Sequence, residues 1–240
     1  MNLGSMMTEI EAALSEGGTW CSFEKAGVLA SIIVATRPNI VVELGVWKGG
    51  SAIPMAIALR YLGAGKLIAI DAWSADASVV GQEDAHQKWW GETMGAEGHE
   101  GAYQVFLARL KKHDITQDRC EIRRKQTDQA DVPKEIDILH HDANHGPQAV
   151  RDIIRWAPAV RVGGFLILDD LDWPGDGAPD ATRYVKRARN RAIELGFEEL
   201  YLLGTGCVMQ RVADLPARRY TGRTGSSDAR LSIGRRGTRH

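Results

Sequence analysis

Carboxylates stand at the ends of several short apolar runs in this chain. Asp71 follows one such run, Asp142 closes a second, and the pair Asp169-Asp170 ends a third. Adjacent carboxylates repel each other, so burying them requires a compensating cation or hydrogen bonds. An oxygen-rich group of this kind suits a hard divalent ion such as Mg²⁺, Mn²⁺ or Ca²⁺. Asp142, Asp169 and Asp170 are therefore candidate metal ligands.

A histidine lies close to the first of these candidate ligands. His145 is three residues after Asp142, at the entry to a helix expected to begin at Pro147. The positive end of the helix dipole favours a neutral imidazole, which can take a proton. His145 is thus a candidate general base, with a helix-entry cap as the alternative. His140 and His141 are expected to be strand residues with satisfied nitrogens, although one of them could flank the metal.

A glycine-rich turn follows the first apolar run. Ile40–Val42 is β-branched and apolar without alternation, which predicts a strand buried on both faces, as in a parallel sheet. Glu43 interrupts the run at its carboxyl end, where open α/β sheets place their ligands. Gly45 and Gly49 let the backbone turn tightly and approach a bound molecule. Ser51 is placed to open the next helix.

This turn differs from the dinucleotide-binding fingerprint. G-x-G-x-x-G needs a second glycine two residues after the first, and Trp47 occupies that position. Glu43 would repel a diphosphate but suits a cation or a hydroxyl or amine donor. An ordinary strand–turn–helix connection is the alternative interpretation.

The second apolar run, Leu67–Ile70, ends in Asp71. The two oxygens of a carboxylate at this place can accept both hydroxyls of a ribose. Asp71 is therefore a candidate ribose ligand, and capping of the following turn is the alternative.

The stretch Glu43–Ser51 (Glu-Leu-Gly-Val-Trp-Lys-Gly-Gly-Ser) resembles the first motif of class I S-adenosylmethionine-dependent methyltransferases. More narrowly, the chain resembles metal-dependent O-methyltransferases of the catechol and macrocin types, over roughly residues 39–211. In that family one acid follows strand four, an acidic pair follows strand five, and a Lys or His near the first acid is the proposed base. The resemblance implies these roles for Asp142, for Asp169-Asp170 and for His145.

The resemblance also implies a cofactor site. The turn would face the methionine part of S-adenosylmethionine, with Glu43 near its amino group, while Asp71 would hold the ribose. Adenine would lie beside Ala72 and Trp73 and near the turn after strand three, where a helix cap is the alternative role for Asp128. The implied cofactor-binding residues are Glu43, Gly45, Trp47, Gly49, Ser51, Asp71, Ala72, Trp73, Asp128 and Asp142.

The elements that must position these residues alternate between strand and helix. We expect an α/β fold: a Rossmann-like, doubly wound sheet of about seven strands with an antiparallel last strand and helices on both faces. Residues 1–38 should form helices that pack on the core, the first starting near a capping box at Thr8, and residues 39–211 the cofactor-binding domain. Residues 74–100, with Trp89-Trp90, are expected to be an insertion over the acceptor or against another subunit.

Composition places the chain among globular proteins. It has 240 residues, 44% of them apolar and 25% charged, and a formal charge of −1. Residues 212–240 hold seven Arg and two Asp, so the tail carries 7 − 2 = +5 and the remainder −1 − 5 = −6. This tail is expected to be disordered, with nucleic-acid binding as the less favoured alternative. No apolar run suggests a membrane span, and three cysteines without metal spacing suggest a reduced, cytoplasmic protein.

The function expected from the sequence is Mg²⁺-assisted O-methylation of a small hydroxylated acceptor. The loop 171–180 would form part of the acceptor site, and a homo-oligomer is possible, but the sequence does not name the acceptor. The alternative is a cofactor-binding accessory protein in a biosynthetic complex that methylates nothing itself. Nicotinamide-dependent oxidoreduction is disfavoured by Trp47.

Overall fold

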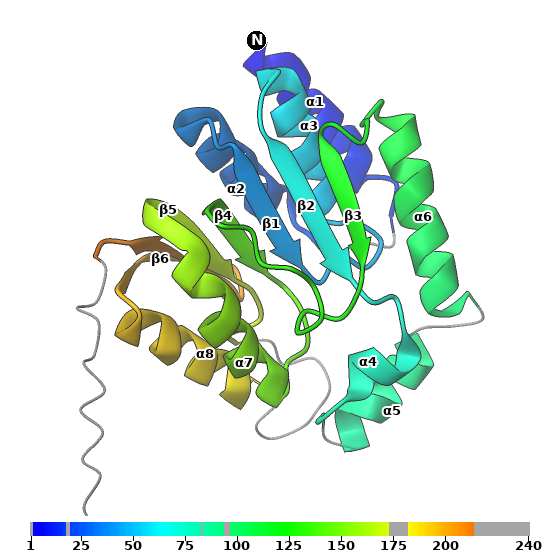
Figure 1. Cartoon of the computed structure of the whole chain (residues 1–240). Coiled ribbons are helices and arrows are strands. Elements are labelled where there is room, and N and C mark those ends of the chain that lie inside the picture. Colours follow the sequence, from blue (N-terminus) through cyan, green and yellow to red (C-terminus); the bar gives the residue numbers. More distant parts are fainter. Residues whose placement is uncertain (1, 18–19, 83, 94–96, 173–181, 214–240) are drawn as a thin grey trace, which may run out of the picture.

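A seven-stranded sheet forms the centre of the computed structural model, with helices on both of its faces (Figure 1). The structure describes residues 2–17, 20–82, 84–93, 97–172 and 182–213. The strand order is β3-β2-β1-β4-β5-β7-β6. The strands are β1 (Ile40–Leu44), β2 (Lys66–Asp71), β3 (Cys120–Arg124), β4 (Ile136–His141), β5 (Val160–Leu168), β6 (Phe197–Leu203) and β7 (Gly206–Arg211).

Strands β1 to β5 pair in parallel, and β7 pairs antiparallel with both β5 and β6. The expected doubly wound sheet with an antiparallel strand at its end is therefore confirmed. The helices are α1 (Leu3–Leu14), α2 (Phe23–Thr36), α3 (Ala52–Leu62), α4 (Ala75–Val79), α5 (Asp84–Thr93), α6 (Gly98–Lys112), α7 (Pro147–Trp156) and α8 (Arg183–Glu194), with a short 3₁₀ turn, η1 (Ala157–Ala159).

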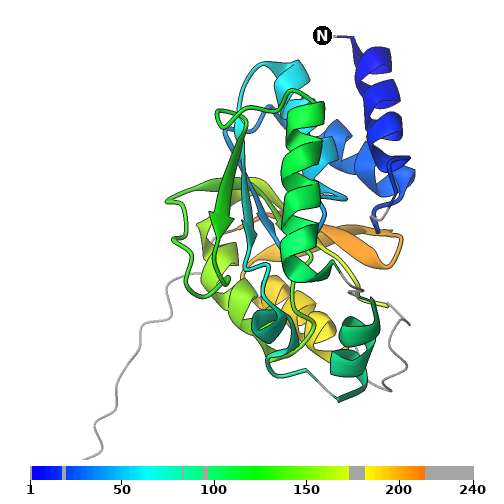
Figure 2. The same cartoon turned by 90° about the vertical axis from the view of Figure 1, so that its right-hand side faces the viewer.

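Successive residues of the central strands face opposite cores, because side chains alternate along a strand. Val41 packs in a cluster with residues of α1, α2, α3 and α6, whereas Val42 packs in a second cluster with residues of α7 and α8. Both valines are fully buried. This accounts for the unbroken apolar runs in the sequence, and the two helical layers are seen on either side of the sheet in Figure 2.

The chain changes direction across the sheet between β1 and β4. β1 pairs with β2 on one side and with β4 on the other, with Glu43 opposite His140. Ligands of open α/β sheets bind at such a switch point, outside the carboxyl ends of the strands. Beyond the strand ends, Asp142 N donates to Leu44 O and Asp169 N donates to His141 O, at 2.9 and 3.0 Å. The candidate acids are thereby aligned along one edge.

Two expectations about the helices need correction or detail. The first helix begins at Leu3, capped by the Asn2 side chain, and not near Thr8, so the capping-box prediction was wrong. In the segment 74–100, two short helices, α4 and α5, lie beyond the carboxyl end of the sheet (Figure 1). The sequence of this segment is polar, contains glycine and has no sustained hydrophobic period, so it did not predict these helices.

Some further expectations concern residues that the structure describes only in part. Most of the loop 171–180 and of the tail 212–240 lies outside them, so neither the predicted acceptor loop nor the predicted disordered tail is described. All three cysteines are free thiols, as expected. In the described ranges, no helix combines the length and the apolar character needed to cross a bilayer.

Candidate active site

A cavity of about 640 Å³ opens at the carboxyl edge of the sheet. This volume falls in the usual range for small-molecule sites. Its wall contains most of the residues singled out from the sequence. These are Gly45, Trp47, Ser51, Asp71, Ala72, Asp128, Asp142, His145, Asp169 and Asp170. Glu43, Gly49 and Trp73 are not part of the wall.

The glycine turn brings the backbone of β1 against the end of β4. Gly45 has φ +83°, and a Cβ added there would lie 1.9 Å from the carbonyl oxygen of Asp142. Gly49 has φ +80°, and an added Cβ would lie 2.5 Å from the ring of Phe106. Trp47 also adopts a positive φ, of 53°. Glycine is thus required at positions 45 and 49, because φ is positive there and because neighbouring atoms leave no space for a Cβ.

Asp71 supports this turn from the end of β2. Its Oδ2 accepts from the backbone N–H groups of Val46 and Trp47, each at 2.9 Å, and its Oδ1 accepts from Trp73 N at 2.7 Å. A carboxylate offers about four acceptor positions. With three positions used, about one acceptor position of Asp71 is left for a ligand. Asp71 therefore both holds the turn and lines the cavity.

Glu43 lies behind the cavity wall. It is fully buried, its Oε1 contacts His140 Nδ1 at 2.9 Å, and the same oxygen accepts from the Ser51 hydroxyl. Trp73 is likewise buried, and its indole N–H donates to Trp47 O at 2.8 Å. In this structure the contacts of both residues brace the turn, and neither residue reaches the cavity directly.

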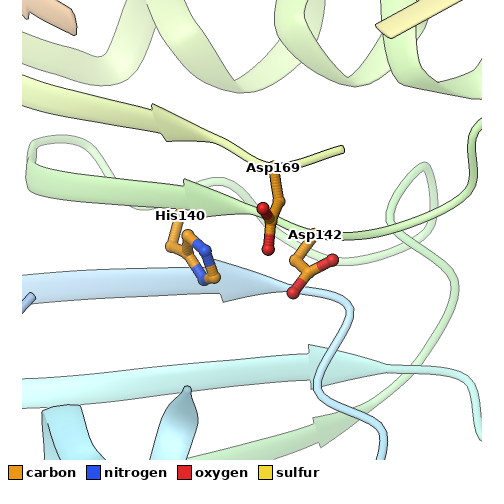
Figure 3. A group of neighbouring side chains, drawn as sticks. All are labelled: His140, Asp142 and Asp169. Carbon is orange, nitrogen blue, oxygen red and sulfur yellow. The ribbon is translucent and has the colours of Figure 1, made fainter. Parts of the chain in front are cut away.

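Asp142 and Asp169 converge as the parallel pairing of β4 and β5 predicted (Figure 3). Between them lies a group that sequence reasoning missed, the ammonium of Lys25 from α2. Lys25 Nζ is 3.2 Å from Asp142 Oδ2 and also bonds Asp169 Oδ2. The Lys25 and Asp169 side chains are about 10% exposed, and that of Asp142 29%.

The electrostatics of this group agree with its geometry. Burial raises the pKa of the Asp142 carboxyl, but Lys25, His140 and His145 outweigh it and hold that pKa below its ordinary value. Burial lowers the pKa of Lys25, while the attraction of Asp142 raises it, and the net shift is upward. Both groups are therefore charged at neutral pH.

His145 and Asp170 form a second pair at the cavity wall. His145 Nε2 lies 3.0 Å from Asp170 Oδ2. Asp170 has φ +57°, and its backbone N–H is bonded to Asp169 Oδ1 at 3.1 Å. An imidazole beside a carboxylate is held in orientation and is stabilised when it becomes protonated. The arrangement can therefore serve proton transfer.

Asp170 does not belong to the group of neighbouring side chains that could hold a metal ion. The groups that lie within 4.8 Å of one another are on His140, Asp142 and Asp169, and these three side chains appear in Figure 3. The Nε2 atom of His140 is buried and has no hydrogen-bond partner among the described residues. The acids thus divide into a Lys25-bound pair and a His145-bound single residue.

An aromatic group forms another part of the wall, and only one of its members was a predicted site residue. The Trp20 and Trp47 rings stack with centroids 5.8 Å apart and an interplanar angle of 4°, and Trp90 lies edge-on to both. His99 contacts Trp47 and Trp90, and burial lowers its pKa. These residues come from three separate stretches of chain, so no spacing in the sequence indicates that they meet.

A signal for Lys25 was present in the sequence. The stretch Phe23–Ala35 is apolar nearly all round, which predicts a buried helix, and Lys25 lies within it. The structure forms this helix as α2. A buried lysine needs an anionic partner, because lysines are almost never fully buried unpaired. That argument predicts a carboxylate facing Lys25 but does not say which one.

Comparisons with known proteins identify the family and the fold of this chain. A family profile described as "Methyltransferase domain" matches residues 42–171, more than half of the chain. The matched segment runs from β1 through the acidic strand ends. A search of curated proteins finds no match.

Solved structures share the fold at low sequence identity. The O-methyltransferase NovP is 15% identical with a TM-score of 0.62, over 80% of this chain and 81% of its own. An O-methyltransferase from Bacillus cereus, solved with SAH, is 16% identical with a TM-score of 0.59, over 87% and 91%. TomG from Streptomyces achromogenes, an O-methyltransferase involved in tomaymycin synthesis and solved with SAM, is 16% identical with a TM-score of 0.56, over 87% and 90%. The chain therefore belongs to the methyltransferase-domain family, and the class I methyltransferase that its glycine turn predicted is confirmed.

Proposed function

We propose that this chain is an S-adenosylmethionine-dependent O-methyltransferase acting on a hydroxyl group of a small molecule, such as a phenol, a sugar or a natural product. One observation carries the proposal. A single cavity at the switch point of the sheet is lined on one side by the glycine turn and Asp71, and on another by His145 and the strand-end acids. The groups proposed to bind the cofactor and to accept the proton therefore line the same cavity.

The residues present fit the cofactor. The backbone at Gly45 packs against that of Asp142 and lines the cavity, so the turn offers a ligand main chain without a side chain at this position. Asp71 retains about one acceptor position for a ribose hydroxyl. Ala72 and Asp128 line the adjoining wall and are proposed to adjoin the adenine. Glu43 is proposed to act on the amino end through Ser51, with which it shares a hydrogen bond.

His145 is proposed as the general base. The bound cofactor supplies a methyl group on a sulfonium, so that an oxygen–methyl bond forms while the sulfur–methyl bond breaks and S-adenosylhomocysteine leaves. His145 takes the proton of the acceptor hydroxyl, and Asp170 orients the imidazole and stabilises its protonated form. Holding the reacting groups in line contributes the rest of the acceleration.

Divalent-metal assistance stays a prediction. The convergence of His140, Asp142 and Asp169 within 4.8 Å supports it. The ammonium of Lys25 argues against it, because it already bonds both carboxylates from a buried position. With Lys25 bonded to both carboxylates, these residues do not fit a metal ion.

The proposed function is tested by product formation. Purified protein is incubated with S-adenosylmethionine and a panel of catechols, sugars and hydroxylated natural products, and S-adenosylhomocysteine is measured by mass spectrometry. We expect acceptor-dependent formation of S-adenosylhomocysteine together with an acceptor heavier by one methylene unit. Binding of S-adenosylmethionine without turnover of any acceptor would contradict the proposal and favour an accessory protein.

A further inference from the structure

Lys25 occupies an unusual position for a lysine. It lies in the first turn of α2, is 7% exposed, and does not belong to the cavity wall. Its Nζ reaches two carboxylates that lie far along the sequence, Asp142 and Asp169. Both of these line the cavity, so Lys25 supports its wall from behind.

The charges around Lys25 leave little need for a second cation. Two strand-end carboxylates share the single ammonium, while Asp170 is paired with His145. Each buried carboxylate must be paired to offset the loss of hydration. A divalent ion placed between Asp142 and Asp169 would compete with Lys25 for the same oxygens and would be repelled by it.

The same cluster would change character without Lys25. Asp142 and Asp169 would each lose their cationic partner, and a ring nitrogen of His140 lies within 4.8 Å of a carboxylate oxygen of each. The Nε2 atom of His140 is buried without a hydrogen-bond partner among the described residues. Two carboxylate oxygens and one imidazole nitrogen form a donor set suited to Mn²⁺.

We propose that the Lys25 ammonium takes the place of the divalent ion that the sequence pattern predicts, so that this chain positions Asp142 and Asp169 without a metal. Lys25 is thus a positioning residue, which acts on the cavity through the two acids. The proposal rests on the proposed function only where enzymatic turnover is the readout. It follows that the donor atoms of a metal site are present in the fold and that the Lys25 side chain alone prevents a metal ion from binding them.

The experiment uses the full chain as wild type, Lys25→Met, Lys25→Arg and Lys66→Ala. Lys25→Met keeps the length of the side chain and removes its charge, whereas Lys25→Arg keeps the charge. Lys66→Ala is the matched control, because Lys66 pairs with Glu121 in a bridge whose side chains are 37% and 38% exposed. Each protein is chelated, and Mn²⁺ binding is then followed by calorimetry and by the midpoint of thermal unfolding.

We expect wild type, Lys25→Arg and Lys66→Ala to show no shift of the unfolding midpoint with Mn²⁺. Lys25→Met should unfold at a lower temperature in chelator, recover with Mn²⁺, and bind this ion at least about tenfold more tightly than wild type. Should Lys25→Met fail to fold, wild type and Lys25→Arg still decide the question. A wild-type midpoint that falls with chelator and rises with Mn²⁺ would overturn the proposal.

Turnover separates this inference from the proposed function. Wild-type enzyme with an accepted substrate should form S-adenosylhomocysteine at the same rate in chelator and in excess Mg²⁺. A rate abolished by chelator and restored by Mg²⁺ would refute the role of Lys25 and leave the proposed function intact. A lack of turnover with every acceptor would refute the proposed function, while the Mn²⁺ binding results would still test the role of Lys25.

Discussion

His145 and Asp170 form an imidazole–carboxylate pair whose Nε2–Oδ2 distance is 3.0 Å, at the wall of the cavity. If His145 is the base, His145→Ala should lower kcat by roughly a hundredfold to ten-thousandfold, the usual contribution of a general base. The affinity for S-adenosylmethionine should stay nearly unchanged, as measured by calorimetry. Asp170→Asn should give a smaller loss, because the imidazole remains. Full turnover of His145→Ala at every pH would rule His145 out as the base.

Asp71 makes two roles separable by experiment. Since it accepts three backbone N–H groups of the glycine turn, Asp71→Asn should lower the free energy of unfolding by about 1–3 kcal/mol. It should also weaken binding of S-adenosylmethionine. Urea unfolding and calorimetry check the two effects. A loss of affinity with unchanged stability would mean that the contacts to the turn contribute little and that Asp71 acts on the ligand alone.

The residue scale shows how far sequence reasoning reaches. Asp71, Asp142 and Asp169 could be placed at one edge because each follows an apolar strand, and the structure brings all three to the cavity wall. The backbone contacts of Asp71 could not be predicted, because they depend on the positive φ of Trp47. The burial of Glu43 could not be predicted either, since its partner His140 comes from a strand distant in sequence.

At the scale of elements, the turn between β1 and α3 packs closely against the backbone that follows β4. Gly45→Ala would place a Cβ 1.9 Å from the Asp142 carbonyl oxygen at φ +83°. We expect this variant to lose at least about 2–3 kcal/mol of stability and to lose cofactor binding. Gly63→Ala is the matched control, because Gly63 has φ +72° but no atom within 4 Å of an added Cβ. It should cost only about 1 kcal/mol.

Chemical denaturation of Gly45→Ala and Gly63→Ala measures that difference. Equal losses would mean that backbone conformation alone, without the contact to Asp142, decides the requirement for glycine. Helix α3 begins directly after Ser51, as predicted, but the Ser51 side chain makes no capping hydrogen bond and donates to Glu43 Oε1 instead. The start of α1 was predicted wrongly, because Asn2 caps the helix six residues earlier than the capping-box sequence at Thr8 suggested. Asn2 and Thr8 are both residue types that favour a helix N-cap, and the local sequence does not show which of them tertiary packing selects.

At the scale of the whole molecule, Asp137 ties the amino ends of three strands. Its carboxylate accepts from Asn39 N and Ile40 N at 2.8 and 2.9 Å and from Arg161 Nε at 2.6 Å. Burial raises the pKa of Asp137, but these bonds outweigh it and hold the pKa below its ordinary 3.8. A depressed folded pKa stabilises the protein above the unfolded value, and this contribution is lost as pH falls through the folded pKa.

Asp137→Asn should therefore destabilise the fold by about 1–3 kcal/mol near neutral pH. The gap between wild type and variant should shrink once the pH falls below 3.8. Urea unfolding across this range checks the sign, with Asp118→Asn, at an exposed aspartate, as the control. A gap that stays constant with pH would mean that the charge of Asp137 does not stabilise the fold.

The doubly wound sheet with an antiparallel last strand could be predicted because acidic strand ends, the glycine turn and apolar runs all indicated one architecture. The cavity wall could be predicted only in part. Three contributing residues come from segments outside the parallel strands. Trp20 and Trp90 line the cavity, and Lys25 bonds the acids of its wall. Their positions follow from tertiary packing and not from spacing in the sequence. Substitutions at Trp20, Trp90 and Lys25 can therefore be used to test acceptor choice and metal dependence.

Calorimetric titration of the chelated wild-type chain with S-adenosylmethionine, and separately with NAD, tests the central claim most directly, since it needs no acceptor. The glycine turn with Trp47 at its third position and Asp71 beneath it predicts saturable binding of S-adenosylmethionine and no binding of NAD. Binding of NAD in place of S-adenosylmethionine, or of neither ligand, would contradict the account.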